Sequence, residues 1–227
     1  MIERPILTPE EKNSCLLEFY QVDHGFHNYA KLEWLRTWLH DEYFNDMRTK
    51  KCLGYVVFGL VRKARGIYNF VLVVQSDVQS TNHIVNENKQ FLKDWKTKLA
   101  EMSDQDFQKL KEGCIAKVSE KYLNMGQMHN DHCEELENKE FAFNRKDLKE
   151  KMLRDLTKKE VEELYADIFL DNPRALEVHF YSPERKEEGI KLRNERIEAG
   201  DNVKFCKNVQ DFKAQQELFV DTYSLLI

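Results

Sequence analysis

Residues 67–75 constrain the fold more than any other stretch of this sequence. The run Phe70-Val-Leu-Val-Val within them is apolar at every position. In an extended chain successive side chains point to opposite faces, so this run is apolar on both faces. A strand of that kind belongs inside a sheet, where helices cover it. Any fold for this chain must therefore build a sheet around residues 67–75.

Other segments predict the elements around this strand. Residues 14–22, 55–62 and 176–181 predict further strands, and Lys63-Ala-Arg-Gly66 predicts a hairpin turn before residues 67–75. Helical spacing and capping signals predict helices over 29–47, around 91–99, from Ser103 to about 118, over about 125–141, and from Thr157 to Asp171. This order predicts an α+β fold, a mainly antiparallel sheet with helices packed on one face.

The length of 227 residues predicts one domain with a proper core. We expect an N-terminal extension over residues 1–12 and the domain over residues 13–181. Residues 182–227 are expected to form a charged linker and a C-terminal tail that packs back on the domain.

Composition and charge indicate which binding partners and which cellular compartment to expect. The formal net charge of −5 gives no reason to expect nucleic-acid binding. No apolar stretch approaches the length of a membrane span. Five scattered cysteines without Cys-x-x-Cys spacing suit reduced thiols. Because the N-terminus also lacks a signal or presequence pattern, we expect a cytoplasmic location, with mitochondria as the alternative.

The segment from Arg48 to Tyr55 is the main candidate for chemistry. It crosses a predicted helix-to-strand junction, and Gly54 is expected to supply a turn conformation there. Arg48 offers a planar fork of donors and Tyr55 one hydroxyl donor. Aimed at one point, these donors can hold a peptide carbonyl and stabilise its oxyanion. The alternative is an arginine that solvates a helix C-terminus and an ordinary strand tyrosine.

A resemblance supports the first interpretation. The run Phe44-Asn-Asp-Met-Arg-Thr-Lys-Lys-Cys-Leu-Gly-Tyr-Val-Val-Phe resembles the signature F-N-x-L-R-T-K-x-x-L-G-Y-x-V of insulin-degrading enzyme and its relatives. This is the insulinase/pitrilysin family of zinc metalloendopeptidases. Further short matches lie in family order along the chain, upstream at residues 13–23 and downstream at residues 70–76, 102–109, 143–147, 156–161 and 208–213. The resemblance is to the family's C-terminal, non-zinc domain.

The resemblance implies roles for Arg48 and Tyr55, which occupy the positions of the family's substrate-contacting pair. In complete enzymes this pair faces zinc held by the N-terminal half. The family's zinc motif His-x-x-Glu-His does not occur among the seven histidines of this chain. We therefore expect no metal cofactor in this chain and zinc in a partner or in a missing N-terminal half.

Two other groups of residues are weaker candidates. His129 and His132 lie three residues apart beside Cys133 and could share a helix face, but a zinc site needs three or four converging ligands. Cys52 lies beside two lysines that would favour its thiolate, yet no general base is identifiable nearby.

Two functions follow from these observations. The first is the non-zinc domain of an insulinase-type metalloendopeptidase, which closes a chamber for peptide substrates and contributes Arg48 and Tyr55. Its partner would be a zinc-bearing insulinase-like half. The second is a catalytically inactive pseudopeptidase that serves as a structural subunit of a larger protein assembly. In neither case is the chain expected to be active alone.

Both functions give the same expectation for metal content. Metal analysis of the purified chain by mass spectrometry should find no stoichiometric zinc, because the chain lacks the family's ligand set. One zinc per chain, lost when His129 and His132 are both changed to alanine, would contradict this expectation.

Overall fold

A computed structural model describes residues 1–5, 8, 10–23, 25–64, 67–137, 141–198, 204–206 and 209–214. Its strands form one five-stranded sheet in the order β1-β5-β2-β4-β3. The strands are β1 (Ile2–Pro5), β2 (Ser14–Val22), β3 (Val56–Ala64), β4 (Ile67–Ser76) and β5 (Ala175–Tyr181). All neighbours pair antiparallel except β1, which runs parallel to β5. The sheet is therefore mainly antiparallel, as predicted.

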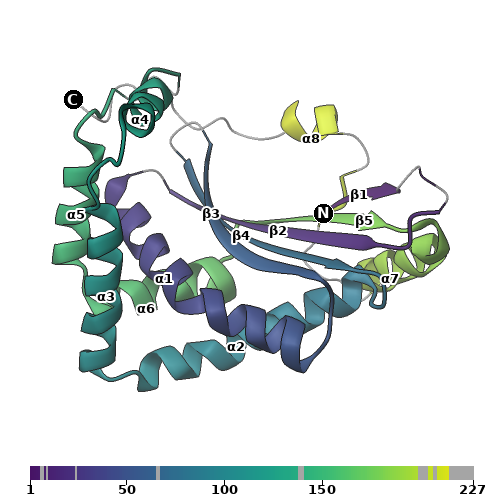
Figure 1. The fold of residues 1–227 in the computed structure, drawn as a ribbon. Coiled ribbons are helices and arrows are strands. Elements are labelled where there is room, and N and C mark those ends of the chain that lie inside the picture. The colour runs from purple at the N-terminus through teal and green to yellow at the C-terminus, as the bar shows by residue number, and fades with distance from the viewer. Residues whose placement is uncertain are drawn as a thin grey trace.

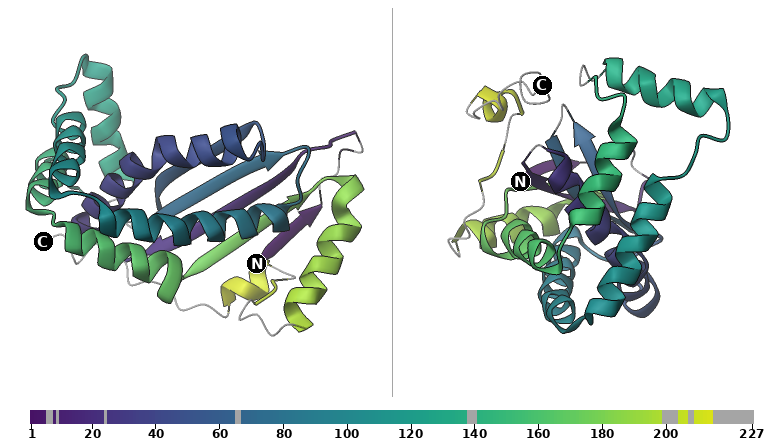
Figure 2. Two further views of the ribbon diagram at one scale, coloured as in Figure 1. Left: turned by 90° about the horizontal axis from the view of Figure 1, so that it is seen from below. Right: turned by 90° about the vertical axis from the view of Figure 1, so that its left-hand side faces the viewer.

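Helices cover one face of this sheet (Figures 1 and 2). Seen from below, α1, α2 and α6 lie in front of the strands, whereas α8 lies on the other side in Figure 1. The helices are α1 (Phe26–Phe44), α2 (Thr81–Glu101), α3 (Asp104–Val118), α4 (Met125–Glu137), α5 (Arg145–Asp155), α6 (Lys158–Ala166), α7 (Lys186–Glu198) and α8 (Val209–Ala214). The short helical turns are η1 (Asn45–Lys50), η2 (Asp167–Asp171) and η3 (Pro183–Arg185). The predicted α+β class is confirmed.

The position of β4 explains its apolar sequence. It pairs with β2 on one side and β3 on the other, so it is an interior strand. Its run from Phe70 to Val74 is buried on both faces. In β2, by contrast, buried and half-buried residues alternate, with Leu16, Tyr20 and Val22 toward the core. The prediction of a covered central strand is confirmed.

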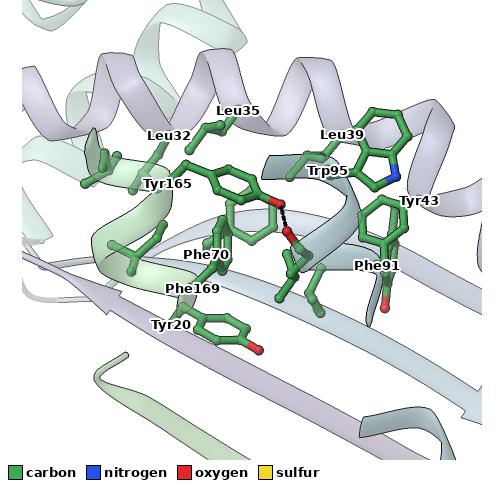
Figure 3. Close-up of a cluster of buried hydrophobic side chains, with 14 of the residues drawn as sticks. Tyr20, Leu32, Leu35, Leu39, Tyr43, Phe70, Phe91, Trp95, Tyr165 and Phe169 are labelled. Carbon is green, nitrogen blue, oxygen red and sulfur yellow. Dashed lines mark hydrogen bonds between the residues drawn. The ribbon is translucent and has the colours of Figure 1, made fainter. Parts of the chain in front are cut away.

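An aromatic cluster joins the helices to the sheet (Figure 3). The ring centroids of Tyr20 and Phe169 are 4.9 Å apart, and those of Phe70 and Phe169 are 5.3 Å apart. The Tyr165 hydroxyl donates a hydrogen bond of 2.8 Å to the Leu92 carbonyl, which satisfies its polar atom inside the core. Edge-to-face pairs of this kind add roughly 0.5–1.5 kcal/mol each beyond area burial.

The helix starts follow local chemistry. Thr157 and Glu160 form the predicted capping box. Ser103 accepts from the backbone N–H of Asp106 as predicted, but its hydroxyl also donates to the Asp106 carboxylate at 2.7 Å. The shorter aspartate therefore bonds the hydroxyl of Ser103, where a glutamate would bond the backbone N–H. The predicted start of the first helix at Tyr29 was late, because α1 begins at Phe26.

Segments near both ends of the chain form regular structure that packs on the domain. The segment expected as an N-terminal extension contains β1, and the charged segment after Tyr181 contains α7. A side chain at Gly189 would place its Cβ only 2.5 Å from the Tyr181 ring, so glycine lets α7 lie close to that ring. The expected hairpin turn at Arg65 and Gly66, and the tail over 215–227, lie outside the described residues.

A buried polar network lies between the sheet and α2. Glu18 on β2 stands directly opposite Glu177 on β5. Asn88 donates to Glu18 and accepts from the Tyr43 hydroxyl at 2.7 Å. Arg196 donates to both carboxylate oxygens of Glu177, at 2.7 and 3.1 Å.

The two carboxyl groups of this network are shifted in opposite directions. Burial raises the pKa of Glu18 to about 7, although the Asn88 hydrogen bond opposes the shift. Burial alone would raise the pKa of Glu177 too, but hydrogen bonds from His179 and Arg196 hold it well below its usual range.

Glu18 should make stability depend on pH. Because its pKa is raised in the folded state, the folded chain binds more protons than the unfolded chain between about pH 4.5 and 7. Its contribution to the unfolding free energy therefore falls as pH rises through that window. The gain in unfolding free energy from Glu18→Gln should be about 2 kcal/mol larger at pH 8 than at pH 5. Urea unfolding at both pH values measures this gain, with exposed Glu101→Gln as control. An equal gain at both values would contradict it.

Candidate functional site

Arg48 and Tyr55 are neighbours at the surface. Arg48 lies in η1, which continues α1, and Tyr55 directly precedes β3. The guanidinium carbon of Arg48 is 4.6 Å from the centroid of the Tyr55 ring and 4.8 Å from that of Phe44. Arg48 is half-buried between these rings, and 78% of Tyr55 is exposed. The structure thus brings the two candidate residues together, outside the packed interior.

The stacked arrangement leaves the donors of Arg48 available. Cation–π contacts use the faces of the guanidinium and leave its N–H edges free. Within the described part of the chain, no hydrogen bond or ion pair engages the Arg48 side chain. Its five N–H donors can therefore bind an external carbonyl or anion without first breaking a bond to the protein.

Ion pairs and a backbone hydrogen bond hold the segment between Arg48 and Tyr55 in place. The Lys51 ammonium lies 2.9 Å from the carboxylates of Asp46 in η1 and Glu87 in α2. The backbone N–H of Leu53 donates to the Met47 carbonyl at 2.9 Å, and both side chains are buried. The backbone geometry near Arg48 and Tyr55 is therefore fixed by the core and by an ion pair to α2.

The role expected for Gly54 was wrong. The positive φ of this segment, 50°, belongs to Cys52, and that of Gly54 is not positive. Glycine is needed at 54 because a Cβ there would lie 1.9 Å from the Gln75 carbonyl oxygen. The start of β3 thus approaches the end of β4 more closely than any side chain permits.

Sequence reasoning missed two residues of this site. Phe44 carries the second ring against Arg48, and Lys51 anchors the loop. Phe44 stands four residues before Arg48, a spacing that places side chains on one helix face, so its contribution was detectable. The Lys51–Glu87 pair joins residues far apart in sequence and had no such signal.

The histidines of α4 do not form a metal centre. Cys133 Sγ lies 3.4 Å from His129 Nε2, while the His132 ring packs against Phe143. No group of three or more His, Cys, Asp or Glu side chains that could hold a metal ion occurs among the described residues. His27 lies in α1, with Nε2 2.9 Å from Glu160. The Cys52 thiol is exposed and lies 3.7 Å from the Thr49 carbonyl.

Known proteins resemble this chain in sequence and in fold. Residues 34–133, which include Arg48 and Tyr55, match the family model described as PQQ synthase PqqF-like, C-terminal lobe domain 4. Insulin-degrading enzyme-like 1, peroxisomal, of Arabidopsis thaliana is 27% identical over 208 residues, 88% of this chain and 21% of that protein. The chain therefore spans about a fifth of the length of this relative.

Two solved structures share the fold. The crystal structure of pitrilysin superposes with a TM-score of 0.76 at 15% identity, covering 97% of this chain and 23% of that one. A peptidase M16 inactive domain from Pseudomonas fluorescens gives 0.57 at 13% identity, with 80% and 43% covered. In the described part of the chain, no helix has the length and apolar character to cross a bilayer.

The packing of Gly54 can be tested by substitution. Gly54→Ala should lower the unfolding free energy by about 2–3 kcal/mol, because the new methyl group meets backbone atoms that cannot move aside. Gly113→Ala is the matched control. It adds the same methyl group to open space in α3 and should raise stability by up to about 1 kcal/mol. Thermal or urea unfolding measures both, and a Gly54→Ala variant as stable as the parent would contradict the close approach.

Proposed function

The chain is a C-terminal domain of the insulinase/pitrilysin family, and on that premise we propose that it forms the non-zinc wall of a peptidase chamber. In this proposal Arg48 and Tyr55 contact a peptide substrate whose bond is cleaved at zinc held elsewhere. Because the chain spans about a fifth of a matching relative, that zinc would belong to a longer polypeptide or to a separate partner.

The observation that carries this proposal is the stacked Arg48–Tyr55 pair. Its guanidinium lies between two rings with its N–H donors unengaged by the described residues. A structural arginine would instead be expected to bond a carboxylate or a helix carbonyl. Donors placed in advance where negative charge develops stabilise a transition state without reorganisation.

The chemistry divides between the two halves. Zinc would activate water and polarise the scissile carbonyl. Arg48 and the Tyr55 hydroxyl would donate to the carbonyl oxygen as it becomes an oxyanion, and the charge on Arg48 would strengthen that interaction. Binding that strengthens in the transition state raises turnover more than substrate affinity.

A second candidate is a structural subunit without a catalytic role. Similarity to an M16 inactive domain favours it. In that case the exposed Arg48–Tyr55 pair would have no chemical task. The two proposals differ in whether substitutions at these residues change peptide hydrolysis by the assembled protein.

Kinetics of the assembled peptidase tests the first proposal. With the zinc-bearing half present, Tyr55→Phe and Arg48→Lys should each lower kcat about 100-fold while KM changes far less, since each removes donors that act mainly in the transition state. Arg62→Lys on exposed β3 makes the same exchange away from the pair and should leave kcat unchanged. Normal turnover by both site variants would favour the structural subunit.

A further inference from the structure

A pocket of about 420 Å³ lies where α5 meets α1 and α3. These three helices pack beside one another, and Figure 1 shows α4 at one end of the group. Lys63 of β3 and Tyr68 of β4 also line the pocket. Neither Arg48 nor Tyr55 lines it, so the pocket is separate from the candidate site described above.

Positive charge is in excess in this pocket. Among the described residues, six lysine and arginine side chains and four carboxylates line it, which leaves an excess of two positive charges. All four carboxylates already have partners in the domain: Glu33 binds Arg36, Glu134 lies 3.8 Å from Lys63, Glu135 binds Arg145, and Asp131 accepts from the Tyr122 hydroxyl at 2.9 Å.

Lys149 of α5 has no carboxylate partner within the described part of the chain. It is half-buried, and its ammonium lies 4.2 Å from the centroid of the Tyr29 ring. Burial raises the pKa of Tyr29, so its phenol is neutral and offers Lys149 only a ring face. By contrast, Lys146 donates to the Glu120 carbonyl at 3.0 Å, and Lys117 is exposed to water. Lys149 therefore combines partial burial with the lack of an anion.

The surroundings of Lys149 favour its neutral amine. Burial lowers the pKa of Lys149 to about 8, and the charges of Arg145 and Lys63 add to this effect. Glu33 and Glu134 oppose the shift, but each already has another cation as partner. At pH 7.5 roughly a quarter of such side chains are neutral, compared with about one in a thousand for an ordinary lysine. A neutral lysine amine is a nucleophile.

We propose that Lys149 is a carbamylation site, at which the side-chain amine takes up carbon dioxide. The amine nitrogen attacks the carbon of CO₂, an N–C bond forms, and one C=O electron pair moves onto oxygen. The proton that the nitrogen loses passes to solvent. The product is a lysine carbamate with one negative charge, and CO₂ is the only co-reactant.

Size and charge identify CO₂ as the electrophile that fits this pocket. The molecule is small and uncharged, so it reaches a half-buried amine without breaking the ion pairs around it. Carbamylation turns one positive charge into one negative charge and so removes the excess of two positive charges. Arg145 and Lys63, which disfavour the ammonium, favour the carbamate for the same electrostatic reason. Acylation of Lys149 would remove only one of these charges.

Trapping in the full chain tests this site. The protein is equilibrated with ¹³C-labelled bicarbonate at pH 7.5, treated with triethyloxonium to fix carbamates as esters, and mapped by peptide mass spectrometry. The trapped yield at Lys149 should exceed that at Lys151 at least 10-fold. Lys151 is the matched control, because it lies on the same helix and is exposed. Equal yields at the two lysines would overturn the proposal, and this comparison needs no variant.

Two variants give an independent measurement. Lys149→Arg keeps the positive charge and removes the nucleophile, so it should abolish one carbamate resonance in the ¹³C NMR spectrum. Lys151→Arg makes the same exchange on the exposed side of α5 and should leave that resonance unchanged. A spectrum of Lys149→Arg identical to that of the parent would contradict the assignment.

Discussion

The burial of β4 on both faces is the constraint on which the rest of this structure depends. A strand that is apolar on both faces needs β2 and β3 beside it and a helical layer against it. Tyr20 and Phe70 project from the sheet to meet Phe169 and Tyr165 (Figure 3). This packing holds α6 and η2 against the sheet.

The domain is tightly packed near Arg48, whereas α4 is attached to it mainly by polar contacts. Near Arg48, buried Met47 and Leu53, the close Gly54–Gln75 approach and the Lys51–Glu87 ion pair leave the backbone little freedom. In α4, charged groups contact the rest of the domain, and apolar side chains face solvent.

Much of the fold could be predicted from periodicity and capping. The strands at 14–22, 67–76 and 175–181 and the capping box at Thr157 follow from alternation, apolar runs and residue chemistry, all of which are local. The pairing of β1 with β5 could not be predicted, because it joins segments more than 170 residues apart. The Glu18–Glu177 pair could not be predicted either, because the register of distant strands decides which side chains stand opposite each other.

For the candidate site, the sequence by itself determined which donors are available, through the residue types at 48 and 55 and a resemblance that covers them. Only the tertiary structure decided that Phe44 and Tyr55 enclose the guanidinium, that Gly54 is required by the Gln75 carbonyl, and that the apolar face of α4 stays exposed. The physical reason is that donor chemistry belongs to individual side chains. Contact and exposure depend instead on how distant segments pack, which local spacing does not encode.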